Sequence, residues 1–205
     1  EISLRDRTLP IPELAVGRLV ETAAEASAVI SAYLGTANGV APTPDSALVT
    51  SYGFLEDGSR AVLEQLEQGM TPINGPAPTI HALIDPFDLP PEDPASWTAD
   101  QLRPLLLAER HDLIFLAGHF NPNQLLAADY STTLAAAEVA AATVDLTNAI
   151  VFSSGCHSGY NLVNAHAVPN VTLDPPDWAQ AFAQKGALLI AGTGYQYGDA
   201  DYMEY

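Results

Sequence analysis

Two apolar runs of this sequence each lead into a residue whose side chain can carry out chemistry. Residues 112–117 lead into His119, and residues 149–152 lead into Cys156. A thiolate is a nucleophile that attacks amide carbonyls, and an adjacent imidazole can take the thiol proton and later deliver it to the leaving amine. The two residues therefore predict nucleophilic catalysis if the fold brings them to one crevice.

Each of these residues also has a purely structural interpretation. A lone cysteine in an α/β protein is often a small buried hydrophobe, and a lone histidine is often a hydrogen-bonded polar group. The paired placement of His119 and Cys156 after two apolar runs favours the catalytic interpretation. His157 adjoins Cys156, but neighbouring side chains of an extended backbone point in opposite directions, so we expect His157 to face solvent or to anchor the loop.

Helical periodicity and continuous apolar runs alternate along the chain. The helical patterns cover residues 21–34, 58–68, 99–109, 134–142 and 177–185. The apolar runs cover residues 47–52, 81–84, 112–117, 149–152 and 187–191. This alternation predicts an α/β domain with a mostly parallel sheet that helices cover on both faces. Functional groups of such sheets collect beyond the carboxyl ends of the strands, where His119 and Cys156 are placed.

Proline and glycine mark the segments that we expect to be irregular. Residues 8–13 and 70–79 are rich in proline, and residues 85–97 are expected to be a surface excursion because they carry four prolines. Thr98 is placed to cap the helix that follows. Residues 192–198 are similar to a dinucleotide-binding fingerprint, but their spacing is one residue too long, so we interpret them as a substrate-facing loop.

The composition narrows the classes of function. The 205 residues fit one domain, or one domain of a longer protein. With 25 acidic residues against 7 basic ones, the formal charge of −18 argues against nucleic acid and anionic membranes, because both require a basic surface. No apolar run is long enough to span a bilayer. A single cysteine excludes an internal disulfide, and the histidines show no HxxxH or HxH spacing that would indicate a zinc site.

Four stretches, in this order, resemble the gingipain family of cysteine peptidases, whose fold is caspase-like. The stretches are residues 9–18, 47–58, 112–119 and 149–156, and the last continues through residues 178–182 and 185–199. Together they span most of the chain. The resemblance implies a caspase-like fold and a cysteine endopeptidase that hydrolyses peptide bonds through a Cys-His dyad.

By this resemblance, Cys156 is the nucleophile and His119 is the general base or acid. The oxyanion donors are the backbone N–H groups of Cys156 and Phe120. The family usually has glycine where this chain has Phe120, and a ring at this position is expected to narrow the cleft or to disturb the donor. Two alternatives stay open: a catalytically inactive caspase-like binding module, and a non-proteolytic cysteine amidohydrolase or acyltransferase that acts on small amides.

The resemblance also implies how a substrate is selected. Relatives that select arginine or lysine before the scissile bond (P1) use an acidic residue early in the helix after the second strand. Asp57 falls near that point, with Glu56 beside it. A buried carboxylate would bind a P1 guanidinium through two charge-assisted hydrogen bonds. The structural alternative is that Asp-Gly forms a common turn and that the helix dipole favours acids there. Tyr195 and Tyr197 are expected to line the specificity pocket, or simply to be aromatic residues at its rim.

The remaining expectations follow from the same resemblance. No cofactor is required; some relatives bind calcium, but no calcium-loop motif is present, so no metal site is assigned. The partner is a protein or peptide substrate, together with further domains of the same polypeptide. We assign residues 1–205 to one caspase-like peptidase domain, as a fragment of a longer chain, with residues 1–45 alternatively at the edge of a preceding subdomain. The relatives are bacterial and exported, which implies an extracellular location.

Overall fold

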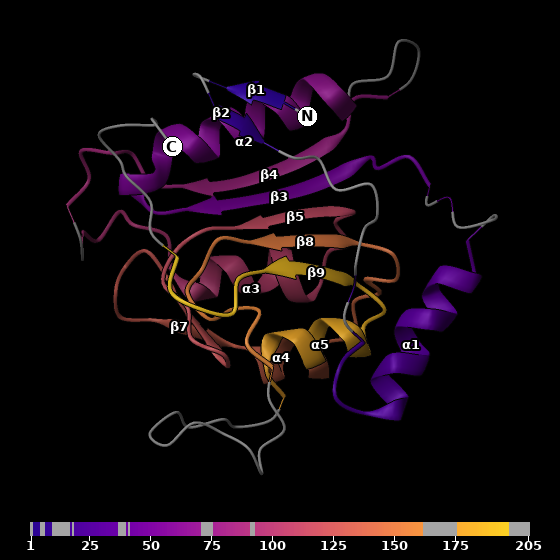
Figure 1. The fold of residues 1–205 in the computed structure, drawn as a ribbon. Coiled ribbons are helices and arrows are strands. Elements are labelled where there is room, and N and C mark those ends of the chain that lie inside the picture. Colours follow the sequence, from indigo (N-terminus) through magenta and orange to yellow (C-terminus); the bar gives the residue numbers. More distant parts are fainter. Residues whose placement is uncertain are drawn as a thin grey trace.

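Five parallel strands form the central sheet of the computed structural model, which describes residues 2–4, 7–9, 17, 19–36, 40, 42–70, 76–90, 93–161 and 176–196 (Figure 1). The strands lie in the order β4 (Thr79–Ile84), β3 (Ser46–Ser51), β5 (Leu113–Leu116), β8 (Ile150–Ser153) and β9 (Leu188–Ala191). Every neighbouring pair in this sheet is parallel. The predicted α/β fold with a mostly parallel sheet is therefore confirmed.

Three helices cover one face of the sheet. They are α3 (Ala99–Leu107), α4 (Ala136–Ala141) and α5 (Trp178–Gln184). Their apolar side chains join the inward-facing strand residues in one buried cluster, which includes Leu48, Leu102, Leu106, Ile114, Val139, Val151 and Phe182. Burial of this apolar surface is the main favourable contribution to folding.

The opposite face of the sheet is covered less completely. α2 (Glu56–Met70) packs on β3 and β4, and its Leu66 lines an apolar pocket together with Phe115 and Phe152. Exposure alternates along β8, so Val151 is buried whereas Phe152 is 44 % exposed. β3 lies between helices on both faces, and every one of its residues is buried. An apolar area over β8 and β9 therefore stays open among the described residues.

α1 (Ala23–Leu34) lies against α5 (Figure 1). Glu25 of α1 is buried, and its carboxylate accepts hydrogen bonds from the side-chain amides of Gln180 and Gln184 of α5, at 3.3 and 3.0 Å. Burial alone would raise the pKa of Glu25, but its hydrogen bonds, led by that from Gln184, hold the pKa below its ordinary value. A buried polar contact therefore fixes α1 to the helix layer.

α1, α3 and α5 each begin with a capping box. The N-cap residues are Thr22, Thr98 and Asp177, and each side chain accepts a hydrogen bond from the backbone N–H three residues later. The prediction that Thr98 caps a helix is confirmed. The helices predicted over residues 21–34, 58–68, 99–109 and 177–185 each lie over an observed helix. None of the helices in the described part of the chain combines the length and apolarity needed to cross a bilayer.

One predicted helix is shorter than the alanine-rich pattern indicates. A helix is expected over residues 134–142, but only Ala136–Ala141 is helical, and Thr133–Ala135 forms strand β7. β7 is antiparallel to β6 (Gln124–Leu126), and Leu134 is buried opposite Leu125. Tertiary burial in this hairpin overrides the local helix propensity of Leu134.

Two irregular segments differ from expectation. β1 (Ile2–Leu4) and β2 (Arg7–Leu9) form an antiparallel hairpin, so the segment predicted to be irregular from residue 8 begins inside a strand, and residues 10–13 lie outside the described residues. The surface excursion over residues 85–97 is buried at both ends rather than superficial throughout. Its Trp97 donates an indole hydrogen bond to the Ser51 carbonyl at 2.9 Å, which anchors the excursion to the end of β3.

Candidate active site

His119 and Cys156 occupy equivalent positions on neighbouring strands. Leu116 of β5 pairs with Ser153 of β8. His119 lies three residues after Leu116, and Cys156 lies three residues after Ser153. The ladder continues beyond the strand ends, because the Ser154 N–H donates to the Leu116 carbonyl at 3.0 Å. Both candidates therefore emerge from the same carboxyl edge of the sheet, where α/β proteins bind ligands.

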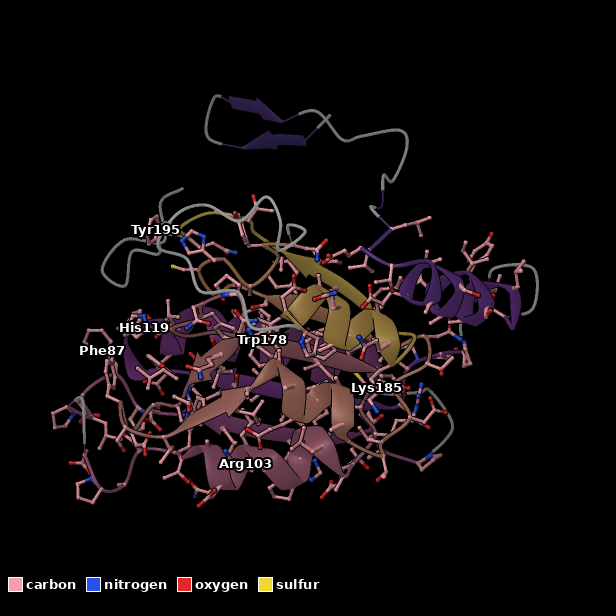
Figure 2. All side chains as sticks on the ribbon, turned by 90° about the horizontal axis from the view of Figure 1, so that it is seen from below. Phe87, Arg103, His119, Trp178, Lys185 and Tyr195 are labelled. Atoms are coloured by element: carbon pink, nitrogen blue, oxygen red, sulfur yellow. The ribbon has the colours of Figure 1, made fainter. Side chains whose placement is uncertain are left out.

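Three aromatic rings surround the imidazole of His119. Tyr52 and Tyr130 meet it edge to face, with centroids 5.1 and 5.5 Å away, and Phe54 lies at 5.9 Å. Burial lowers the pKa of His119 below its ordinary value, so the neutral imidazole, which can accept a proton, is favoured. The residue nevertheless keeps an exposed surface. Figure 2 shows His119 at the same end of the molecule as Phe87.

Tyr52 holds the loop that carries His119. It is buried directly after β3, and its hydroxyl donates to the Leu126 carbonyl of β6 at 2.5 Å. The Leu126 N–H in turn donates to the His119 carbonyl at 3.0 Å. Gly118 permits this packing, because a Cβ atom there would lie only 2.8 Å from the Tyr52 ring. Burial raises the pKa of Tyr52, so its hydroxyl stays protonated and donates.

Cys156 lies in a turn that the chain after β9 holds from the other side. The Gln196 N–H donates to Cys156 Sγ at 3.4 Å, and Sγ lies 3.6 Å from the Gln196 carbonyl oxygen. The Gln196 side-chain amide also donates to the Gly155 carbonyl at 3.2 Å. The Ser158 hydroxyl closes the turn by donating to the same carbonyl at 2.7 Å. The backbone of Gln196 and the turn around Gly155 therefore fix the position of the thiol.

Further contacts tie the loop after β8 to the loop after β9. The N–H groups of His157 and Gly159 donate to the carbonyls of Gly194 and Gly192, both at 2.9 Å. Nδ1 of His157 lies 3.0 Å from the Thr193 carbonyl oxygen. His157 therefore anchors the loop, which is one of the two structural roles expected for it.

Among the residues that the structure describes, no hydrogen bond joins the Cys156 thiol to the His119 ring. The thiol contacts the backbone of Gln196, and the imidazole contacts aromatic rings. Catalytic hydrogen bonds are often long or misaligned without substrate and tighten in the Michaelis complex. The structure therefore places both residues at one edge of the sheet, and the thiol and the imidazole each contact other groups.

The Phe120 ring packs against the cysteine loop. It covers Gly155, where a Cβ atom would overlap the ring, and it meets Trp178 edge to face with centroids 5.6 Å apart. The ring also packs against the buried core. Phe120 therefore supports the loop that precedes Cys156, while its expected effect on the oxyanion donor stays a prediction.

The predicted substrate-binding residues differ in their surroundings. Asp57 is exposed in the first turn of α2, so it is not the buried carboxylate that the hypothesis describes. Its position agrees with the structural interpretation, in which acids stabilise the start of a helix. Tyr195 is 71 % exposed and meets His157 edge to face, with centroids 4.6 Å apart. Tyr197 lies outside the described residues.

A pocket beside His119 contains a carboxylate that the sequence patterns did not single out. The pocket has a volume of about 190 Å³, and its lining includes Tyr52, Phe54, Asp85, Phe87 and Tyr130. Three of these rings also surround His119. Asp85 is buried, and its Oδ1 accepts a hydrogen bond from the Trp97 N–H at 3.3 Å. Oδ2 of Asp85 makes no hydrogen bond to any described residue.

The sequence did contain a signal for Asp85. It directly follows the apolar run over residues 81–84, which is strand β4, so it stands at the carboxyl edge as His119 and Cys156 do. The four prolines that follow it indicate loop structure, which hides this signal. A carboxylate among aromatic faces favours a cation, which gains an ion pair and cation–π contacts together.

Comparisons with known proteins do not extend this description. No family model, curated protein or solved structure matches the chain. The fold and the site define an α/β protein with a five-stranded parallel sheet that brings a histidine and a cysteine to one carboxyl edge.

Proposed function

We propose that this protein is a cysteine endopeptidase with a caspase-like fold, similar to the gingipains, in which Cys156 is the nucleophile and His119 its acid–base partner. The observation that carries the proposal is the equivalent placement of both residues beyond the Leu116–Ser153 pair of two neighbouring strands. Parallel strands in register hold the two groups at the same edge, which is what a dyad from distant parts of the chain requires.

Each chemical step uses a group that stands at this edge. His119 is neutral because burial lowers its pKa, and it accepts the proton of the Cys156 thiol. The thiolate attacks the scissile carbonyl, and the backbone N–H groups of Cys156 and Phe120 stabilise the oxyanion. Protonated His119 then gives its proton to the leaving amine as the C–N bond breaks. A water molecule that His119 activates hydrolyses the thioester and restores the thiol.

We assign the pocket beside His119 to a basic side chain of the substrate, with Asp85 rather than Asp57 as the carboxylate partner. Oδ2 of Asp85 is left without a described hydrogen bond, so it can accept from an ammonium or guanidinium group. The rings of Phe54 and Phe87 line the same pocket and suit the cation and its aliphatic stem. An exposed carboxylate such as Asp57 would bind the same cation more weakly, because water screens it.

Cleavage of fluorogenic peptides with Arg, Lys, Asp, Leu or Ala at P1 tests the proposal. Wild-type protein is compared with Cys156→Ala, each with calcium and with EDTA. Cleavage after Arg or Lys that Cys156→Ala abolishes is the expected result. No cleavage of any peptide by a folded protein whose thiol is also unreactive would contradict the proposal. Small amides in the same assay separate a peptidase from an amidohydrolase or acyltransferase.

A second candidate function is a catalytically inactive module that binds a partner at the same edge. One observation favours it: the thiol contacts the Gln196 backbone and, within the described residues, makes no hydrogen bond to His119. The rate of alkylation by iodoacetamide near neutral pH separates the two functions. A working dyad reacts faster than free cysteine and is slowed by His119→Ala, whereas a structural thiol reacts slowly in both proteins.

A further inference from the structure

Two histidines and a glutamate meet near the amino ends of the strands, away from the candidate active site. His81 lies in the first half of β4, and Glu109 and His111 lie between α3 and β5. His111 is buried, His81 is half-buried and Glu109 is exposed. The three residues therefore form a group with a buried base that opens to solvent at Glu109.

The potential ligand atoms of these residues face one another. Nδ1 of His81 lies 3.0 Å from Nε2 of His111 and 3.5 Å from Oε2 of Glu109. All three atoms lie within 4.8 Å of one another. Zinc holds imidazole nitrogen and carboxylate oxygen at about 2.0–2.2 Å, so the ligand atoms of a tetrahedral site lie about 3.3–3.5 Å apart. The first two separations are within a few tenths of an ångström of that spacing.

The His111 ring is buried and places Nε2 toward the other two potential ligand atoms. Its Nδ1 is also buried and has no hydrogen-bond partner among the described residues. A metal ion on Nε2 would fix the tautomer of this ring, with the proton on Nδ1.

We propose that His81, Glu109 and His111 bind a divalent transition-metal ion, with Zn²⁺ as the ion that best suits two imidazoles and one carboxylate. Calcium prefers oxygen ligands and fits this set poorly. Water completes the coordination on the exposed side. The bound ion ties the sheet's edge strand β4 to the segment between α3 and β5, and the proposal does not depend on peptidase activity.

Metal titration in a Cys156→Ala background tests this site, because that background removes the one cysteine as a competing ligand. After chelation with EDTA and removal of the chelator, calorimetric titration with Zn²⁺ is expected to give one site per chain. Co²⁺ is expected to give the visible absorption of tetrahedral coordination. Adding His81→Gln is expected to weaken Zn²⁺ binding about tenfold or more. Zn²⁺ is also expected to raise the thermal unfolding midpoint of the parent but not of the His81→Gln protein.

Two further variants make the test decisive. Glu109→Gln removes an exposed ligand and so weakens Zn²⁺ binding without exposing the core. His157→Gln is the matched control, because it removes an imidazole outside the group and is expected to leave Zn²⁺ affinity unchanged. Equal Zn²⁺ affinity in His81→Gln, Glu109→Gln and the parent would overturn the proposal. So would the absence of Zn²⁺ binding by the folded Cys156→Ala protein.

Discussion

The ring of Tyr52 meets the imidazole of His119 edge to face, with centroids 5.1 Å apart. Tyr52 follows β3 and His119 follows β5, and these two strands are neighbours. The strand on one side of β5 therefore supplies the residue that positions His119, and the strand on the other side leads to Cys156. The packing of Tyr52 against His119 can therefore be altered by substitutions that leave His119 and Cys156 unchanged.

Replacing Gly118 with alanine is expected to disturb this support. The new Cβ atom would lie 2.8 Å from the Tyr52 ring, so the ring or the loop must move. Overpacking of this kind lowers the free energy of unfolding by about 1–3 kcal/mol, which urea denaturation measures. Gly58→Ala is the control, because no atom lies within 4 Å of its new Cβ and a helix interior favours alanine. Equal stability of the two variants would contradict the proposed packing.

Tyr52→Phe removes one buried hydroxyl and keeps the ring beside His119. The Leu126 carbonyl then loses its 2.5 Å hydrogen bond, so the free energy of unfolding is expected to fall by about 1–2 kcal/mol. Denaturant unfolding measures the change, and Tyr33→Phe on the exposed side of α1 is the control. If both variants are as stable as the wild type, the Tyr52 hydroxyl does not hold the loop.

The pH dependence of activity is expected to follow His119. Its pKa is lowered by burial, and the neutral ring is the base, so activity is present above the folded-state pKa and is lost as the pH falls through it. The acid limb of kcat/KM should therefore have its midpoint below about 6.5, the ordinary value for histidine. NMR titration of His119 in the Cys156→Ala variant measures the same pKa without the thiol. A midpoint above the ordinary value in both measurements would contradict this assignment.

Asp85→Asn is expected to raise KM for peptides with Arg or Lys at P1 by about tenfold or more, because the buried pocket loses its charge partner. Peptides with Leu at P1 should be affected little. Asp57→Asn is the matched control, since Asp57 is exposed and its loss should leave KM nearly unchanged. If Asp57→Asn raised this KM and Asp85→Asn did not, Asp57 would be the residue that selects the basic P1 side chain.

Much of the fold was predictable because its strands are continuous apolar runs separated by helical patterns. β3 is buried along its whole length, so its sequence lacks the alternation of apolar and polar residues that is typical of a strand with one face in solvent. The hairpin of β6 and β7 was not predictable, because Leu134 lies in an alanine-rich segment with high helix propensity and its strand conformation depends on pairing with Leu125. Sequence periodicity reports local preference and does not report such distant pairing.

The placement of His119 and Cys156 at one edge of the sheet was predictable, because each follows an apolar run. The contact between Cys156 and Gln196 was not, because it depends on how two loops after different strands meet. The distinction between Asp57 and Asp85 was not predictable either, since both are acids that closely follow a predicted strand and only their burial in the folded chain separates them.

The pairing of β8 with β9 also sets when this site can form. All contacts in a parallel sheet join distant parts of the chain, so such sheets assemble slowly compared with helices. Gln196 reaches Cys156 only after β9, near the end of the described chain, has joined the sheet. During synthesis, the thiol therefore acquires its final environment late, after all five strands of the central sheet have been made. A chain that stalls before β9 is made carries a thiol that lacks its contacts with Gln196.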